Sequence, residues 1–316
     1  MIDKLYNISK GLELQDDVYS VILFEGSKNH FLGINNDGHF ALLLKTSNRE
    51  QKKFVNFRGK NLQILFDRES AINNKGLNSF EQFTILHLLS DKRSVQNYFI
   101  EICKILISNL GESPKIIKVH KELESVKDIF LNLNKTKIKE EIGLWGELFL
   151  IYSQENKEKA ISLWHLKPTD RIDFNSGKVK IEVKTTLSNE RKHIFKLNQL
   201  RNHYTEKVLV CSIMTTEIES GISIRDLINK ISNELNNEMK LVLLNKVSSI
   251  LGSDLLSISY RYFDEKSAFD SLRIYESNEV PAIENDCIVS EVSNIIFTSN
   301  LNKTKYLGLD IKKLIY

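Results

Sequence analysis

An alternation of apolar and charged residues between positions 171 and 186 constrains this chain more than any other feature. In the run KVKIEVK (178–184), odd-numbered positions are apolar and even-numbered positions are charged. Successive side chains of a β-strand point to opposite faces, so this period of two predicts a strand with one apolar face. RIDF (171–174) alternates in the same way, and Asn175-Ser176-Gly177 lies between the two runs. Together they predict a β-hairpin.

Pairing of these strands with their apolar faces together would bring Asp173, Glu182 and Lys184 to one polar surface. Two carboxylates beside a lysine suit Mg²⁺, which prefers oxygen ligands and keeps several waters. The lysine can orient or polarise an attacking water and stabilise charge that develops on a phosphate. The simpler alternative is a charged strand face that contacts only solvent, as E-x-K tripeptides often do.

The first part of the chain is predicted to be β-rich and then helical. Asn35-Asn36-Asp37-Gly38 predicts a hairpin turn, because these residues tolerate positive φ angles. A first helix is predicted from Ser79, with apolar residues at helical spacing, and a second from about Ser94 to Gly111. A loose connection is expected around Pro114. Strands are predicted at 18–24, 30–34, 39–46, 53–57 and 62–66.

In the second part, KIKEEIGLWGELFLIYSQ predicts a helix whose Trp145 belongs to the core. Gly143 and Gly146, three positions apart, would let this helix approach the sheet closely. VLVCSIM predicts a strand buried on both faces. Helical character is also predicted over about 196–203 and over 224–235, and the last eighty residues are expected to form short strands.

The order GLWGELFL, Trp164, PTDRIDF, IEVKTT, R-x-H and QL, over about 140–200, resembles the PD-(D/E)XK nuclease superfamily. More narrowly, it resembles a bacterial PD-(D/E)XK family found among restriction and phage-defence genes. The resemblance implies an α/β fold with a restriction-endonuclease-like mixed sheet flanked by helices. We expect a β-rich domain over 1–112, a connecting segment over 113–135, the catalytic core over 136–215 and an α+β extension over 216–316.

The resemblance also implies roles for individual residues. Asp173 and Glu182 would bind the metal, Lys184 would be the catalytic lysine, Glu147 the acid of the first helix, and Gln199 a polar residue of the following helix. The implied activity is hydrolysis of DNA with Mg²⁺, for which Mn²⁺ can substitute.

The sequence departs from the family pattern in one respect, because Pro168 is not directly followed by an acidic residue. Asp170 and Asp173 both remain candidates for that position. We prefer Asp173, since it falls within the predicted strand and shares its polar face with Glu182.

A basic segment follows the hairpin and predicts the surface that binds nucleic acid. Residues 165–207 contain ten Lys and Arg but five Asp and Glu, whereas the rest of the chain has 34 basic and 36 acidic residues. Such cations contact phosphates without reading sequence. The alternative is a basic face exposed only to solvent. The predicted contacts are Thr186, Arg191, Lys192, His193, Lys196, Gln199 and Arg201.

Other classes of protein are not supported. The three cysteines are far apart, the histidines lack zinc-hydrolase spacing, and no P-loop or G-x-S-x-G motif is present. No apolar run reaches the ~20 residues of a membrane helix, so we expect a cytoplasmic protein without membrane contact.

The expected partner is DNA. A double-strand cut would favour a homodimer, and a defence role implies a partner ATPase or methyltransferase. Two alternatives stay open, an inactive nuclease-fold module that binds nucleic acid or scaffolds a defence complex, and a structural protein with a solvated hairpin.

Overall fold

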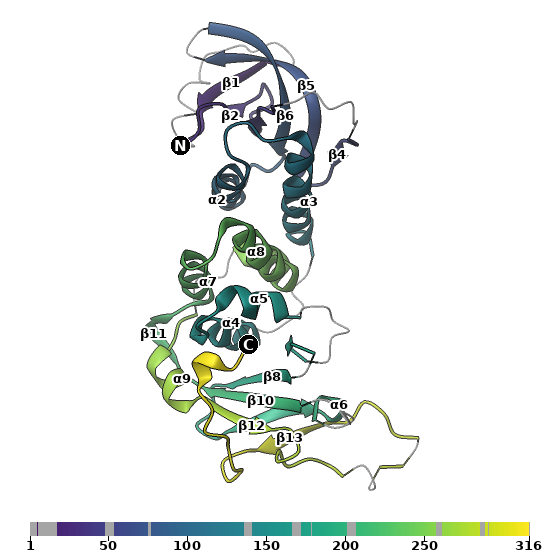
Figure 1. The fold of residues 1–316 in the computed structure, drawn as a ribbon, viewed down its shortest axis with the longest axis vertical. Helices are drawn as coiled ribbons and strands as arrows, with labels where there is room; N and C mark the ends of the chain where they lie inside the picture. The colour runs from purple at the N-terminus through teal and green to yellow at the C-terminus, as the bar shows by residue number, and fades with distance from the viewer. Residues whose placement is uncertain are drawn as a thin grey trace. The chain divides into compact units, whose positions relative to one another are not determined.

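The computed structural model describes residues 5, 18–47, 54–74, 77–135, 141–165, 172–177, 179–200, 207–256, 261–284, 288–289 and 291–315. The chain forms two compact units. Figure 1 shows both of them, coloured by residue number from the N-terminus to the C-terminus. Unit 1 comprises Met1–Thr136 and Lys240–Leu256, and unit 2 comprises Lys137–Met239 and Ser257–Tyr316. Helices and sheets occur in both units, which confirms a mixed α/β chain.

Unit 1 contains a six-stranded sheet in the order β1-β2-β3-β6-β5-β4, and β1 also pairs with β5, so five strands close on themselves. The predicted hairpin turn joins β2 to β3, and Gly38 has a φ of 79° there. The strands are β1 (Val18–Leu23), β2 (Phe31–Ile34), β3 (Phe40–Leu44), β4 (Phe57–Arg58), β5 (Leu62–Asn74) and β6 (Leu77–Leu88).

The helix predicted from Ser79 is wrong, because these residues form β6, which pairs with β5 along its length. Phe83 and Ile85 enter the core of the sheet, while Thr84 and Leu86, on the other face, are buried as well. A strand with both faces buried lacks the polar alternation that marks strands in a sequence.

Two helices complete this part of unit 1. α2 (Arg93–Leu110) ends at Gly111, whose φ is 73°, as the sequence predicted. α3 (Ile116–Asn132) occupies most of the segment 113–135, where a connection was expected. Its Asn132 donates a hydrogen bond to Ser248 of α8 (Asn237–Leu251), a helix that begins in unit 2 and continues in unit 1.

Unit 2 is built on a four-stranded sheet in the order β12-β10-β8-β7, in which β8 and β10 run parallel and the other pairs are antiparallel. β9 and β13 form a separate antiparallel ribbon. The strands are β7 (Phe174–Asn175), β8 (Val179–Thr186), β9 (Lys192–Lys196), β10 (Lys207–Met214), β11 (Glu217–Ile222), β12 (Arg273–Glu276) and β13 (Ile296–Asn300). The helices lying wholly in unit 2 are α4 (Glu141–Ser153), α5 (Lys157–Leu163), α6 (Leu197–Leu200), α7 (Ile224–Asn233) and α9 (Glu265–Ser271).

The predicted hairpin is present as β7 and β8, with Phe174 opposite Ile181 and Asn175 opposite Lys180. Gly177 in its turn has a φ of 84°, a conformation that favours glycine. Arg171 and Lys178 lie outside the described residues.

Helix α4 packs against β8, the central contact of unit 2 (Figure 1). A Cβ placed on Gly146 would lie 1.8 Å from Oγ1 of Thr185, so the predicted close approach is real at this glycine. Trp145 is fully buried, as expected, and its indole N–H donates to the carbonyl of Ile222 at 2.9 Å.

The C-terminal prediction of short strands is correct only in part. β12 and β13 are short strands of the kind expected in this region. The helices α8 and α9 were not expected there. Residues 257–260, 285–287, 290 and 316 lie outside the described residues.

Candidate active site

Three polar side chains form a cluster on the even-numbered face of β8, two from the strand itself and one from α6. Nζ of Lys184 lies 2.7 Å from Oε1 of Glu182, and the same Glu182 oxygen accepts a hydrogen bond of 2.6 Å from the amide of Gln199. The Lys184 ammonium also donates to Oε1 of Gln199 at 3.3 Å. The sequence predicted all three residues, and the structure brings them together.

Burial distinguishes this cluster from an ordinary charged strand face. Glu182 is only 3% exposed, and a buried carboxylate is costly unless it is paired and hydrogen-bonded. The backbone N–H of Lys196 donates to Oε1 of Gln199 at 3.0 Å, which fixes the orientation of the amide. Nζ of Lys184 also lies 5.3 Å from the ring centre of Phe195. The charged face of β8 is therefore covered by β9 and α6, and the solvated-hairpin alternative does not describe Glu182.

Asp173 lies immediately before β7, at the edge of β8. Its Oδ2 accepts a hydrogen bond of 2.8 Å from the backbone N–H of Val183, the residue between Glu182 and Lys184. Its backbone carbonyl accepts another of 2.7 Å from the N–H of His165. Continuing the β7–β8 register by one residue places Asp173 opposite Glu182. Asp170, the alternative candidate, lies outside the described residues.

Glu147 is held in a different environment. It is 1% exposed, and its Oε2 accepts a hydrogen bond of 2.8 Å from the indole of Trp164. Trp164 in turn forms a β-bridge with Phe174 of β7. The neighbouring Gly146 meets Thr185, whose side chain alternates to the face of β8 opposite Glu182 and Lys184. Across the described parts of the chain, no three His, Cys, Asp or Glu side chains gather closely enough to hold a metal ion.

Two predicted nucleic-acid contacts lie in the interior instead. Arg191 donates to the carbonyl and hydroxyl oxygens of Ser212 and to the carbonyl of Ser271. Nε2 of His193 lies 2.7 Å from the hydroxyl oxygen of Ser212. Both side chains are buried, so neither is placed to reach a phosphate, and we leave them out of the proposed interface.

Burial also sets the charge of His193. Loss of solvation, reinforced by the positive charges of Arg191 and Lys184, lowers the pKa of His193 to about 3. The imidazole is therefore neutral at pH 7. Because arginine can only donate, the Ser212 hydroxyl oxygen accepts from Arg191, and the same hydroxyl group is hydrogen-bonded to Nε2 of His193.

The remaining predicted contacts are closer to solvent. Lys192 and Lys196 are exposed, and Lys192 forms an ion pair with Glu190. Thr186 is half-buried, and its Oγ1 accepts a hydrogen bond from the backbone of Ser188. Arg201 lies outside the described residues.

The residues that hold the buried side chains by hydrogen bonds were not predicted from the sequence. Ser212 is a polar residue within the apolar run VLVCSIM, and it lies opposite Lys184 in the β8–β10 register. That single polar position was the available signal. Trp164 was identified only as part of the family pattern. Its hydrogen bond to Glu147 could not be predicted from the spacing of residues along the sequence.

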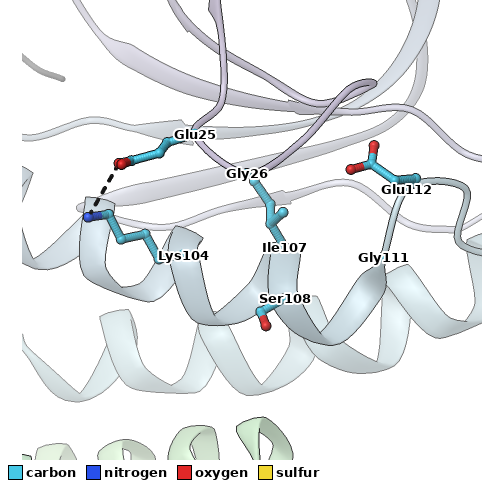
Figure 2. A pocket seen from close by; sticks show the side chains of 7 residues that line it. All are labelled: Glu25, Gly26, Lys104, Ile107, Ser108, Gly111 and Glu112. Carbon is cyan, nitrogen blue, oxygen red and sulfur yellow. Dashed lines mark ion pairs between the residues drawn. The ribbon is translucent and has the colours of Figure 1, made fainter.

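A separate hollow of about 420 Å³ lies in unit 1, between the β1–β2 turn and α2 (Figure 2). Lys104 faces Glu25 across it at 3.8 Å. Oε2 of Glu112 accepts hydrogen bonds from the backbone of Lys28 and Asn29. These contacts tie the β1–β2 turn to the end of α2, so the charges around this hollow have a structural explanation.

Comparison with known proteins identifies one matching family. The sequence model of a protein family matches residues 10–302, and its description reads "Putative PD-(D/E)XK family member, (DUF4420)". No curated protein matches the chain, and no solved structure does. None of the helices in the described ranges is both long and apolar enough to cross a bilayer.

Proposed function

Because the chain belongs to this family of PD-(D/E)XK proteins, we propose that it is a Mg²⁺-dependent endonuclease that hydrolyses DNA phosphodiester bonds. The observation that carries the proposal is the buried cluster of Glu182, Lys184 and Gln199, with Asp173 bonded to the same strand. The order α4, α5, β7, β8, β9, α6, β10 supports a restriction-endonuclease-like core. The role in bacterial restriction or phage defence rests on the family resemblance alone.

The donor set suits a hard divalent cation. Mg²⁺ is commonly bound through one or two carboxylates, with waters and substrate phosphate completing its shell. Asp173 and Glu182 supply two such groups on adjoining strands, and we assign the metal to them. When bound, Mg²⁺ would supply positive charge for the phosphate and would acidify a water molecule.

The chain's own residues would then position the reacting groups. Gln199 holds the Glu182 carboxylate and the Lys184 ammonium in a fixed relation through one amide. Lys184 can orient the attacking water and stabilise charge that develops on the phosphate oxygens. Glu147 of α4 would support the site through Trp164, which pairs with Phe174 of β7.

A nicking assay on supercoiled plasmid with Mg²⁺ tests this proposal. The wild type is expected to relax the plasmid, and the Asp173→Ala/Lys184→Ala variant to leave it intact. Equal nicking by the two proteins would overturn the assignment.

The alternative is a binding module without catalysis. One observation favours it, namely that no three candidate ligands gather within the described residues. Titration with Mg²⁺ in a calorimeter separates the two functions, because a binding-only module should show no heat that depends on Asp173 and Glu182.

We also propose an oligomeric state, partners, a location and an alternative metal for the protein. A double-strand break would need two copies of the site, which favours a homodimer. A partner ATPase or methyltransferase and substitution of Mg²⁺ by Mn²⁺ follow from the resemblance, whereas the proposed cytoplasmic location rests on the apolar runs of the sequence.

A further inference from the structure

The β9–β13 ribbon presents one outward face of unusual composition. Side chains alternate along β9, so His193 and Phe195 are buried while their neighbours point outward. Ile194 is 64% exposed on β9 and Ile296 is 60% exposed on β13. We call the outward set the ribbon face; its members are Lys192, Ile194, Lys196, Ile296, Thr298 and Asn300.

Charged and apolar residues are interleaved across this face. Ile296 lies directly opposite Lys196, and Ile194 lies opposite Thr298. The third pair joins Lys192 to Asn300. The ribbon face thus has two exposed isoleucines in a diagonal relation, a lysine at each end of its β9 edge and no acidic member.

The strand β9, which carries part of the ribbon face, also contacts the candidate active site through its backbone and its buried side chains. The backbone N–H of Lys196 bonds to Gln199, which contacts Glu182 and Lys184. The backbone N–H of Leu197 bonds to the carbonyl of Ile295, which ties α6 to the start of β13. A groove of about 540 Å³ lies at this junction, and Val289 and Val292 are exposed along it.

We propose that the ribbon face binds the minor groove of duplex DNA, with Ile194 and Ile296 against the base pairs and Lys192 and Lys196 on the flanking phosphates. Proteins that bind this groove commonly combine basic residues with aliphatic side chains that press between base steps. The inference rests on the proposed nuclease function and narrows its substrate to duplex DNA. Duplex RNA should bind less well, because its minor groove is wide and shallow.

A second copy of the chain fits this face less well. The cores of protein–protein interfaces are depleted in lysine, whereas here Lys196 lies directly beside Ile296 in the pairing register. The ion pair of Lys192 with Glu190 is exposed, so Lys192 can exchange that partner for a phosphate.

The test measures binding of a short DNA duplex and a matching RNA duplex by fluorescence anisotropy, with Ca²⁺ replacing Mg²⁺. The variant is Ile194→Thr/Ile296→Thr, which keeps β-branched residues in both strands. The control is Ile218→Thr on β11, where Ile218 is 37% exposed. Loss of two isoleucines that bound DNA would bury predicts DNA binding weaker by about tenfold or more, with little change in RNA binding and none in the control.

Each outcome bears on a distinct claim. Wild-type affinity in the double variant would overturn the ribbon-face proposal while leaving the nuclease function intact. Unchanged DNA affinity with loss of a dimer in sedimentation velocity would show instead that the face joins two copies. Absence of both DNA binding and nicking in the wild type would overturn the nuclease function and this inference with it.

Discussion

At the scale of single residues, the main feature of the candidate site is a buried charged group. Glu182 is almost fully enclosed, and its negative charge is balanced by Lys184 and by the amide of Gln199. Removing one member of such a group leaves the others buried without compensation, which commonly costs more than the group contributes in net stability. An arrangement that is costly to build and easily disturbed is typical of active sites.

His193 gives a prediction for the dependence of stability on pH. Its pKa is about 3 in the folded protein and near 6.5 when unfolded, so the unfolded chain binds more protons between these values. Stability from the neutral imidazole is present above pH 6.5 and is lost as the pH falls toward 3. Unit 2 should lose about 2 kcal/mol between pH 7 and pH 5 from this residue alone.

Urea unfolding at the two pH values measures this loss, and His193→Gln serves as the reference because glutamine does not titrate. The variant should lose less stability over the same interval than the wild type. Equal losses in the two proteins would show that His193 does not carry the effect.

A sequence pattern predicts the strand face on which a residue lies, but it does not predict which distant residues cover that face. The period of two correctly placed Glu182 and Lys184 on one face of a strand, because that property is local. It could not show that Phe195 and α6 cover this face, since the covering residues come from later elements. For the same reason Arg191 and His193 were predicted on a basic surface, although Ser212 holds both in the interior.

At the scale of elements, the packing of α4 on β8 decides where the site lies. Gly146 permits the approach, and among the described residues the buried Oγ1 of Thr185 has no hydrogen-bond partner. The contact sets the distance between the helix that carries Glu147 and the strand that carries Glu182.

Gly146→Ala is expected to destabilise unit 2 by about 2 kcal/mol, because the new methyl group would clash with Thr185. A change of rotamer gives limited relief, since the Thr185 Cβ is itself 3.0 Å from the added carbon. Thr185→Ala should restore part of the loss in the double variant, because it removes Oγ1 but keeps Cβ. Urea unfolding of the four proteins in this cycle measures the coupling, and simple additivity of the two changes would contradict the account.

The two tryptophans of unit 2 form a matched pair for a second prediction. Both are fully buried and each donates one indole hydrogen bond, Trp164 to the carboxylate of Glu147 and Trp145 to the carbonyl of Ile222. Trp164→Phe should cost about 1–3 kcal/mol more than the loss of packing, because the buried carboxyl group of Glu147 loses its donor. Trp145→Phe should lower the stability of unit 2 by less than this beyond its own loss of packing, because its indole donates to a backbone carbonyl.

Circular dichroism during urea unfolding gives the two stabilities, and the nicking assay gives the two activities. Only Trp164→Phe should reduce nicking beyond what its stability explains. Equal loss of activity in both variants would indicate that Glu147 has no special link to the site.

Elements with local signals were predicted well. The β7–β8 hairpin, α2 and α7 follow from alternation, helical spacing and turn residues that lie close together in the chain. β6 was mistaken for a helix because its two buried faces remove the alternation. The helix α8 was missed, and it begins in one compact unit and continues in the other.

At the scale of the whole molecule, the chain passes between its two units more than once. Residues 240–256 belong to unit 1, although the segments on either side of them belong to unit 2. A cut after residue 136 therefore does not separate the units. Both tryptophans of the chain lie in unit 2, so their fluorescence reports on that unit.

This organisation predicts the behaviour of fragments. Residues 137–316 alone should aggregate, because Leu241, Leu243 and Val247 are buried in the full chain and would lack the rest of unit 1. Replacing 240–256 by a flexible Gly/Ser linker should give a soluble fragment with a cooperative tryptophan transition. Solubility of the first fragment, or failure of the second to fold, would contradict this division.

The central claim is that the β8 cluster hydrolyses DNA, and one comparison tests it most directly. Lys184 and Lys180 share a face of β8 by alternation, but only Lys184 is expected to act in catalysis. The rate of plasmid nicking with Mg²⁺ should fall by at least about a hundredfold in Lys184→Met and stay near the wild-type value in Lys180→Met. Equal rates in the two variants, or nicking that persists without divalent metal, would contradict the account.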